Sequence, residues 1–107
     1  MSFSLDDLAK LIRARSEAPE GTSYTKSLLT AGAPRIAKKF GEEAIETVIA
    51  ALGEDDKALA SEIADVLYHL LVLMEARGIA LSSVLAELER RTTQSGLAEK
   101  ASRSAAP

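Results

Sequence analysis

Five carboxylates near the middle of the chain are the side chains best suited to chemistry. Glu42, Glu43 and Glu46 form an E-E-x-x-E pattern. Glu62 and Asp65 form an E-x-x-D pattern further along the chain. Acids gathered in this way repel one another unless a cation neutralises them, so the two patterns predict a divalent-metal site. A site that offers only oxygen ligands favours Mg²⁺, Mn²⁺ or Ca²⁺ over zinc.

A turn signal, Gly53-Glu54-Asp55, lies midway between the two acidic patterns. Both flanking segments have the periodicity of helices, so we expect an antiparallel helix hairpin folded about this turn. Equal distances from the turn set Glu46 opposite Glu62. They also set Glu43 opposite Asp65. The hairpin is therefore the element that must bring these acids together.

The helix over 34–52 presents its acids on a narrow stripe. Glu43 and Glu46 share this stripe with Lys39, and Glu42 borders it. Taken alone, such a stripe is an ordinary solvated face. The other half of the helix is apolar and is expected to be buried; it consists of Ile36, Phe40, Ala44, Ile45, Val48 and Leu52.

The helix over 56–77 is apolar almost all round, and a helix of that kind is expected to be buried. Glu62, Asp65 and His69 form a stripe of their own, apart from the polar side of this helix. An unpaired carboxylate among apolar neighbours is costly or becomes protonated. No lysine or arginine lies between the ends of the helix, so Lys39 and its neighbours or a bound cation must neutralise the acids.

The rest of the sequence fits an all-α fold. Capping and stop residues predict further helices over about 5–18 and 82–92, with a short helix over 24–30. We expect a helical bundle of four to five helices, built on the central antiparallel hairpin. One domain spans 1–94, and the small polar residues of 95–107 form a mobile tail.

The composition excludes several classes of function. The chain has 107 residues, a net charge of −3 and a sequence pI of about 5.2, unlike the basic footprint of a nucleic-acid-binding protein. The absence of cysteine and the single histidine rule out thiolate chemistry and a histidine-rich metal site. The start of the chain does not resemble a signal peptide, and the longest apolar run, 66–74, is too short to span a bilayer. We therefore expect a cytoplasmic protein without a membrane partner.

The two acidic patterns resemble the signature of the all-α nucleoside triphosphate pyrophosphohydrolases, the MazG and dimeric dUTPase group. Three further segments narrow the resemblance to the phosphoribosyl-ATP pyrophosphatases of histidine biosynthesis, over residues 4–103. These segments are Ser23-Tyr24-Thr25 with Leu28-Leu29, Arg35 to Ala44, and Asp65 to Leu73. One position departs from the family pattern: Ser27 stands where a lysine usually precedes the Leu-Leu pair, and Lys26 comes one residue earlier.

The resemblance implies hydrolysis of the α–β phosphoanhydride of phosphoribosyl-ATP to phosphoribosyl-AMP and pyrophosphate, the second step of histidine biosynthesis. It also implies a Mg²⁺-dependent enzyme in which Mn²⁺ can substitute. The implied metal ligands are Glu43, Glu46, Glu62 and Asp65. Glu42 would bind an additional ion, hold the metal ligands in place without contacting the metal itself, or act as the base that activates water. Such a site suits phosphoryl transfer, which depends on positioning and charge neutralisation.

The resemblance also directs attention to residues that would contact the substrate. Lys39 shares the acidic stripe and is the leading candidate for a phosphate contact, ahead of Lys38 and Arg35 on the same helix. Tyr24 is the nearest candidate for stacking on the base. His69 has three alternative roles: it contacts a phosphate, orients the acid one turn before it, or fills the core or an interface.

A homodimer is expected for a physical reason. The apolar helix over 56–77 needs more cover than the few remaining helices can supply, so a second copy should bury the rest. The resemblance implies a homodimer as well.

Three other functions remain to be weighed. A housekeeping pyrophosphatase of noncanonical nucleoside triphosphates would share the metal site and differ in the base and ribose pocket. A di-iron oxidoreductase would need Glu-x-x-His pairs on two helices, whereas His69 is the single histidine of the chain. A non-catalytic interaction module would leave the clustered acids unexplained.

Overall fold

The computed structural model describes residues 2–93 and 96–105, which form six helices and no strand. The helices are α1 (Leu5–Ser16), α2 (Tyr24–Ala31), α3 (Ala33–Gly53), α4 (Asp56–Arg77), α5 (Leu81–Arg91) and α6 (Gly96–Ala105). The predicted all-α fold is confirmed. The sixth helix was not expected, because it lies in the segment that the sequence predicts as a mobile tail.

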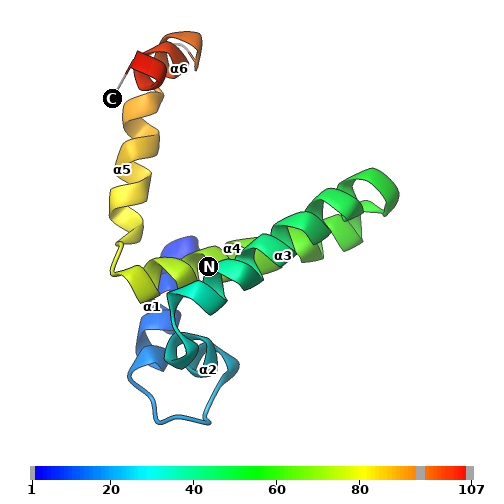
Figure 1. Cartoon of the computed structure of the whole chain (residues 1–107), viewed down its shortest axis with the longest axis vertical. Coiled ribbons are helices and arrows are strands. Elements are labelled where there is room, and N and C mark those ends of the chain that lie inside the picture. Colours follow the sequence, from blue (N-terminus) through cyan, green and yellow to red (C-terminus); the bar gives the residue numbers. More distant parts are fainter. Residues whose placement is uncertain (1, 94–95, 106–107) are drawn as a thin grey trace.

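The predicted hairpin is formed by α3 and α4, which run antiparallel and side by side (Figure 1). The turn between them is short because Asp55 caps α4: its carboxylate accepts a hydrogen bond from the Ala58 amide at 2.8 Å. At the far end of α4, Gly78 adopts the left-handed conformation of a helix stop, with a φ of 69°. These local signals set the register in which the two acidic patterns meet.

The core lies where α1 and α2 pack across the C-terminal half of α4. Its buried side chains are Ile12, Leu28, Ile36, Leu71, Val72 and Met74. At the start of α1, Ser4 and Asp7 exchange hydrogen bonds between side chains and amides, which forms a capping box. Gly32, with a φ of 98°, makes the sharp corner between α2 and α3. One end of the hairpin is thus firmly held, and the other end extends beyond the core (Figure 1).

The extending end of α3 departs from the expected burial. Ile45, Val48 and Leu52 were predicted to lie on a buried face, but they are 63%, 57% and 85% exposed. The reason is that α4 covers the side of α3 that contains the fully buried Ala50. The three exposed residues lie round the helix from Ala50 and point away from α4.

The helix α5 stands apart from this body. The chain bends by 112° between α4 and α5, so that α5 projects from the hairpin and the chain is L-shaped (Figure 1). Among the described residues, the closely packed helix pairs all belong to α1 through α4. Within the same residues, no single helix is long and apolar enough to cross a membrane. Only α4 and α5 taken together, as a bent pair, reach the length and apolar composition of a membrane span.

Candidate active site

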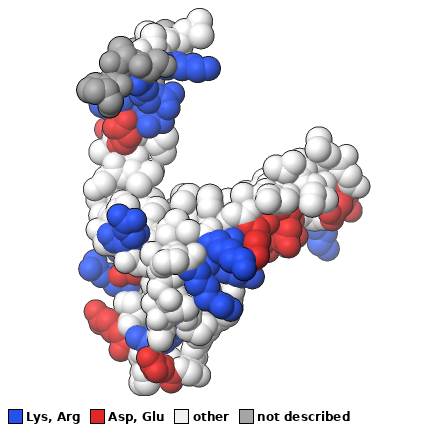
Figure 2. All heavy atoms as spheres, viewed as in Figure 1, with Lys and Arg blue, Asp and Glu red and all other residues white. Residues whose placement is uncertain are grey.

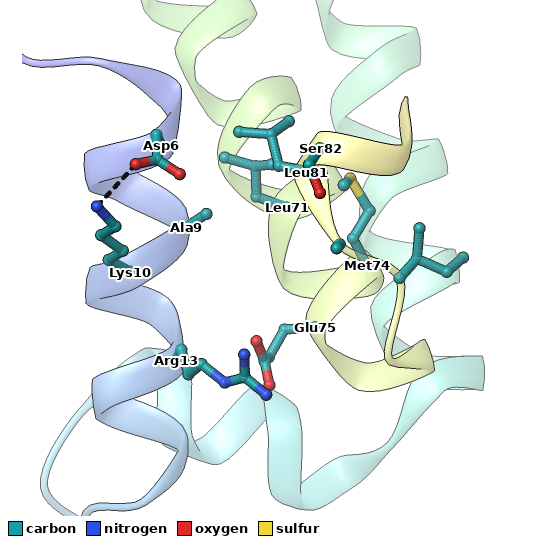
Figure 3. A pocket seen from close by; sticks show the side chains of 11 residues that line it. Asp6, Ala9, Lys10, Arg13, Leu71, Met74, Glu75, Leu81 and Ser82 are labelled. Atoms are coloured by element: carbon teal, nitrogen blue, oxygen red, sulfur yellow. Dashed lines mark ion pairs between the residues drawn. The ribbon is translucent and has the colours of Figure 1, made fainter. Parts of the chain in front are cut away.

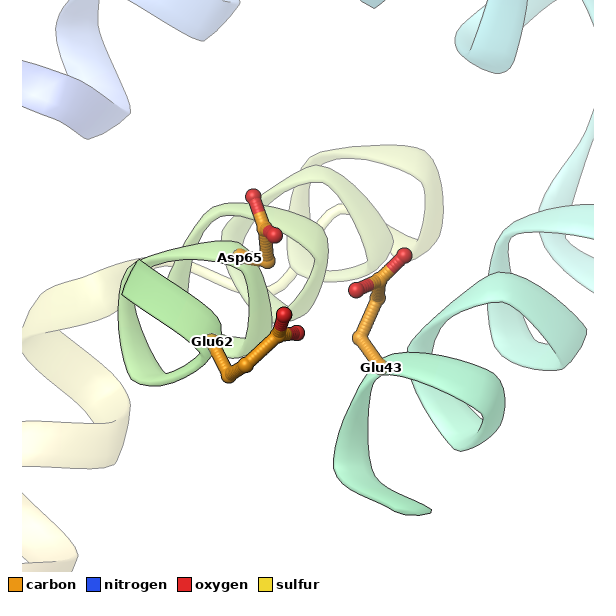
Figure 4. Close-up of side chains that lie close together, drawn as sticks. All are labelled: Glu43, Glu62 and Asp65. Carbon is orange, nitrogen blue, oxygen red and sulfur yellow. The ribbon is translucent and has the colours of Figure 1, made fainter. Parts of the chain in front are cut away.

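Three carboxylates from the two hairpin helices converge on one point. Glu43 of α3 and Glu62 and Asp65 of α4 each offer an oxygen within 4.8 Å of the others (Figure 4). Asp65 follows Glu62 by three residues, so both side chains lie on one face of α4. Glu46 is not one of these three, but it adjoins them and raises the pKa of both Glu43 and Glu62. The structure therefore brings together three of the four acids that the hairpin symmetry placed opposite one another, with Glu46 beside them.

The acids of this cluster make it harder for one another to carry a charge. Burial raises the pKa of Glu43 above its usual value, and the neighbouring Glu46 and Asp65 raise it further. Burial also raises the pKa of Glu62, again with added repulsion from Glu46 and Asp65. These shifts are the electrostatic signature of a site that favours a bound cation.

The donor set fits a hard divalent metal ion. Oε2 of Glu62 is buried without a hydrogen-bond partner among the described residues, which is costly unless a ligand occupies it. Glu43 is half-buried, as is Glu62, but Asp65 is exposed. The expectation that Asp65 lies on a buried stripe was therefore wrong, because α1 and α2 cover α4 only beyond this point. An open side suits Mg²⁺, which keeps waters and accepts phosphate oxygens beside a few carboxylates.

Positive side chains adjoin the acids along α3. Lys39 lies one turn before Glu43, and its Nζ pairs with Oε1 of Glu42 at 3.6 Å. In Figure 2, lysine and arginine side chains gather beside a row of acids on the hairpin. The site therefore offers attraction for an anionic substrate next to its cation-binding acids.

A cavity of about 490 Å³ opens between α2 and the first half of α3. It is lined by Tyr24, Ser27, Leu28, Arg35 and Lys39. Three predicted substrate contacts, Tyr24, Arg35 and Lys39, thus meet at one cavity. Lys38 does not belong to the lining and is exposed on the outer surface of α3, and His69 does not line it either.

Lys26, next to the position that departs from the family pattern, is occupied elsewhere. Its Nζ donates a hydrogen bond to the carbonyl of Ser16 at 2.8 Å, which ties α2 to the end of α1. Ser27 lines the cavity instead, and its hydroxyl donates to the carbonyl of Tyr24 at 2.6 Å. Lys26 therefore has a structural role, and the hydroxyl of Ser27 faces the cavity.

An aromatic group beside the cavity was missed from the sequence. Tyr24 and Tyr68 stack with ring centroids 6.5 Å apart and planes at 21°. The Tyr68 hydroxyl forms a hydrogen bond with the hydroxyl of Thr25, which fastens α2 to α4. The two tyrosines are far apart in the sequence, so no local spacing could reveal their contact. Tyr24 remains 56% exposed and presents a ring face for stacking.

His69 is buried behind this aromatic group. It meets Tyr68 edge-on, with centroids 5.0 Å apart. Its Nδ1–H donates to the backbone carbonyl of Asp65 at 2.8 Å, and Nε2 is buried without a partner among the described residues. Because the hydrogen bond goes to the backbone, His69 does not hold the Asp65 carboxylate directly. Of its three alternative roles, the geometry favours the one in the core.

A second cavity, of about 270 Å³, lies between α1 and the junction of α4 with α5 (Figure 3). Lys10 pairs with Asp6 at 2.9 Å on its wall, and Arg13 and Glu75 point toward each other across it. None of the clustered acids lines this cavity. Its opposite charges are already close to one another, so it offers no equivalent of the metal site.

Known proteins share this sequence along nearly its whole length. The sequence model of the phosphoribosyl-ATP pyrophosphohydrolase family matches residues 5–92. A phosphoribosyl-ATP pyrophosphatase from Methylobacterium nodulans is 57% identical over 102 residues, which are 95% of each chain. Proteins of the same name from Azorhizobium caulinodans and Rhizobium johnstonii are 55% and 56% identical. Each of these two alignments covers 94% of this chain, with 92% and 94% of the relative.

Proposed function

Because this chain belongs to the phosphoribosyl-ATP pyrophosphohydrolase family, we propose that it hydrolyses the α–β phosphoanhydride of phosphoribosyl-ATP. One water molecule is consumed, and the products are phosphoribosyl-AMP and pyrophosphate. The reaction is the second step of histidine biosynthesis. The metal cofactor is Mg²⁺, for which Mn²⁺ can substitute.

One observation carries the proposal: a cluster of acids lies one helical turn from a cationic, aromatic cavity. Lys39 lines the cavity and lies one turn from Glu43, whose oxygen is within 4.8 Å of those of Glu62 and Asp65. A nucleotide with a phosphate chain requires both features side by side. The acids would hold a metal ion that neutralises phosphate charge, and the cavity would receive the nucleotide.

The acids divide into ligands and a support. Glu43, Glu46, Glu62 and Asp65 are the proposed metal ligands. A bound Mg²⁺ would screen the phosphate charge and lower the pKa of the attacking water. Glu42 pairs with Lys39, so we assign it to holding that ammonium group in place rather than to abstracting a proton.

The cavity residues orient the substrate. Arg35 and Lys39 supply fixed positive charge for phosphate oxygens, and the planar guanidinium of Arg35 can bind two of them at once. Tyr24 presents its exposed ring to the adenine, with Tyr68 stacked behind it. His69 packs against Tyr68 and keeps this wall rigid.

We further propose that the protein is a cytoplasmic homodimer with one domain over 1–94 and no nucleic-acid or membrane partner. The large exposed apolar side chains of α3 and α5 support the dimer. The net charge of −3 argues against binding to nucleic acid.

The test is pyrophosphate release from phosphoribosyl-ATP, beside a panel of ordinary and modified nucleoside triphosphates, with Mg²⁺ and with EDTA. We expect Mg²⁺-dependent release from phosphoribosyl-ATP, and release at least about 100-fold slower with the Glu62→Gln variant. Release from the triphosphates alone would replace the substrate with that of a housekeeping pyrophosphatase. Absence of release from every compound would overturn the enzymatic proposal.

A further inference from the structure

The cavity between α2 and α3 is lined by cations and one aromatic ring, and no carboxylate belongs to its lining among the described residues. Arg35 and Lys39 attract anions, and the hydroxyl of Ser27 donates its hydrogen to the carbonyl of Tyr24. The face of an aromatic ring carries negative charge density, which attracts cations. The ring of Tyr24 is therefore the principal group in this lining that favours a positively charged part of a ligand.

Tyr24 is held in place by its neighbours on α2 and α4. The hydroxyl of Ser23 accepts a hydrogen bond from the Lys26 amide at 3.0 Å, which fixes the start of α2 just before the tyrosine. The next residue, Thr25, is 2% exposed and is bonded to the hydroxyl of Tyr68, whose ring stacks on that of Tyr24. A ring that is fixed in this way but still exposed needs little ordering when a ligand binds.

The aromatic stack lies about one helical turn from the acids. Tyr68 comes one turn after Asp65 on α4, and Lys39 comes one turn before Glu43 on α3, a rise of roughly 5 Å along each helix. Because the two helices run antiparallel, both steps lead to the same side of the acidic cluster. A nucleotide whose phosphates meet the acids can thus lay its base on Tyr24, with the ribose in between.

The substrate of the proposed function differs from ATP in the charge of its base. In phosphoribosyl-ATP the additional phosphoribosyl group is attached to N1 of the adenine. A substituent at N1 makes adenine more basic, so that the base is protonated and positively charged at neutral pH, whereas the adenine of ATP is neutral. Arg35 and Lys39 do not exclude this cation, because the triphosphate of the same molecule carries more negative charge than the base carries positive charge.

We propose that Tyr24 is a specificity-determining residue, which selects a nucleotide with a positively charged, N1-substituted adenine over ATP by stacking its ring on that cation. This selection rests on the proposed function and adds the means by which the site distinguishes its substrate from ATP. The metal ion and the triphosphate are common to both nucleotides and give no such distinction. One cation–π contact corresponds to a preference of about 3- to 30-fold in Kd.

The first test compares two ligands that differ in charge and hardly in shape. They are the α,β-methylene analogues of N1-methyl-ATP, whose base is a cation, and of N1-methyl-inosine triphosphate, whose base is neutral. The methylene group replaces the oxygen of the scissile bond, so neither ligand is hydrolysed there. In calorimetry with Mg²⁺, we expect the unmodified protein to bind the cationic analogue about 3- to 30-fold more tightly. Equal affinities would overturn the proposal without any variant.

Variants of the cavity locate the preference. Tyr24→Leu removes the ring and should bind the two analogues with nearly equal affinity, whereas Tyr24→Phe keeps the ring face and should retain the preference. Ser27→Ala, which changes a neutral side chain of the same lining, is the matched control and should retain it as well. A preference that persists in Tyr24→Leu would assign the selection to another part of the protein and overturn the proposal.

The second test changes the charge density of the ring and hardly its shape. Phenylalanines with increasing numbers of fluorine atoms are incorporated in place of Tyr24, because fluorine withdraws negative charge from the ring face. We expect the affinity for the cationic analogue to fall with each added fluorine while the affinity for the neutral analogue stays nearly constant. Equal changes for both analogues would mean that the ring acts only as an apolar surface, which overturns the proposal.

Both tests measure binding, so they separate this selection from the hydrolysis itself. A protein that shows the preference dependent on Tyr24 but releases no pyrophosphate from phosphoribosyl-ATP would retain the selection and refute the proposed activity. A protein that hydrolyses phosphoribosyl-ATP but binds the two analogues equally would retain the activity and refute the selection.

Discussion

Glu62 is the residue on which the proposed metal site most depends, because one of its oxygens is buried without a partner in the described structure. Glu62→Gln keeps the shape and removes the charge. We expect it to lower the rate of pyrophosphate release by at least about 100-fold, since even residues behind metal ligands contribute 10–100-fold. It should also abolish the rise in unfolding temperature on addition of Mg²⁺. Glu75→Gln on the same helix is the control, and an equal loss there would point to general damage.

The raised pKa values of Glu43 and Glu62 give the metal-free protein a definite pH dependence. The folded chain holds these protons more tightly than the unfolded chain does. Stability from this source is therefore greatest below the ordinary pKa of 4.5 and is lost as pH rises through the raised values.

In EDTA, we expect the double variant Glu43→Gln, Glu62→Gln to unfold at a higher temperature than the unmodified protein at neutral pH. The difference should shrink toward pH 4.5, where the unmodified acids become protonated as well. With Mg²⁺ at neutral pH the order should reverse. A difference in EDTA that grows as the pH falls would show that the acids do not repel one another as the structure indicates.

The cavity separates the basic residues of α3, which the sequence alone ranked by their position on the helix. Arg35 and Lys39 line it, and Lys38 does not. We expect Arg35→Ala and Lys39→Ala each to raise the KM for phosphoribosyl-ATP by about 10- to 100-fold, the range for a lost charged hydrogen bond. Lys38→Ala should leave KM nearly unchanged. Equal effects of all three substitutions would indicate long-range charge attraction instead of contact in this cavity.

At the scale of secondary-structure elements, the cap at the hairpin turn fixes how the acidic patterns meet. Asp55 accepts a hydrogen bond from the Ala58 amide, whereas Asp56 starts the helix without an equivalent bond among the described contacts. Asp55→Ala should lower the free energy of unfolding by about 1 kcal/mol in a urea titration. Asp56→Ala removes the same charge and should have a smaller effect. If the two variants lose the same stability, charge near the helix start matters more than the cap.

The element boundaries were largely predictable because caps and stops act locally. Asp55 and Gly78 determine where α4 begins and ends, through contacts within a few residues. Such short-range signals can be recognised from the sequence alone. The hairpin symmetry, and with it the meeting of the acids, followed from those boundaries. By contrast, α6 was missed because its apolar face consists almost entirely of alanines, with Leu97 as its single large apolar side chain.

Burial and the nucleotide cavity were not predictable in the same way, because they depend on which elements pack together. Ile45 and Val48 lie on a regular apolar face, and the sequence does not tell whether the same chain or a second one covers it. The stack of Tyr24 on Tyr68 likewise depends on how α2 sits on α4. Asp65 was expected to be buried because its neighbours on α4 are apolar, whereas α1 and α2 cover α4 only beyond this residue.

At the scale of the whole molecule, the L shape leaves much of its apolar surface uncovered. The core holds the open end of the hairpin, where α3 begins and α4 ends, while the turn end extends beyond the core and α5 has Leu81 packed against the core at its base. Association should therefore contribute to folding, and stability should depend on protein concentration, because a partner that binds only the folded chain stabilises it by mass action.

The urea midpoint of the unmodified protein should accordingly rise with protein concentration across the micromolar range, and Mg²⁺-dependent pyrophosphate release per chain should fall on dilution. Leu88→Asp places a charge among the exposed apolar side chains of α5, so we expect this variant to stay monomeric and to show neither dependence. The unmodified protein and Leu88→Asp are compared at equal concentrations of Mg²⁺, so that a difference in metal binding does not shift the urea midpoint. A midpoint independent of concentration for the unmodified protein, with full activity after dilution, would mean that one chain stabilises its own acidic cluster.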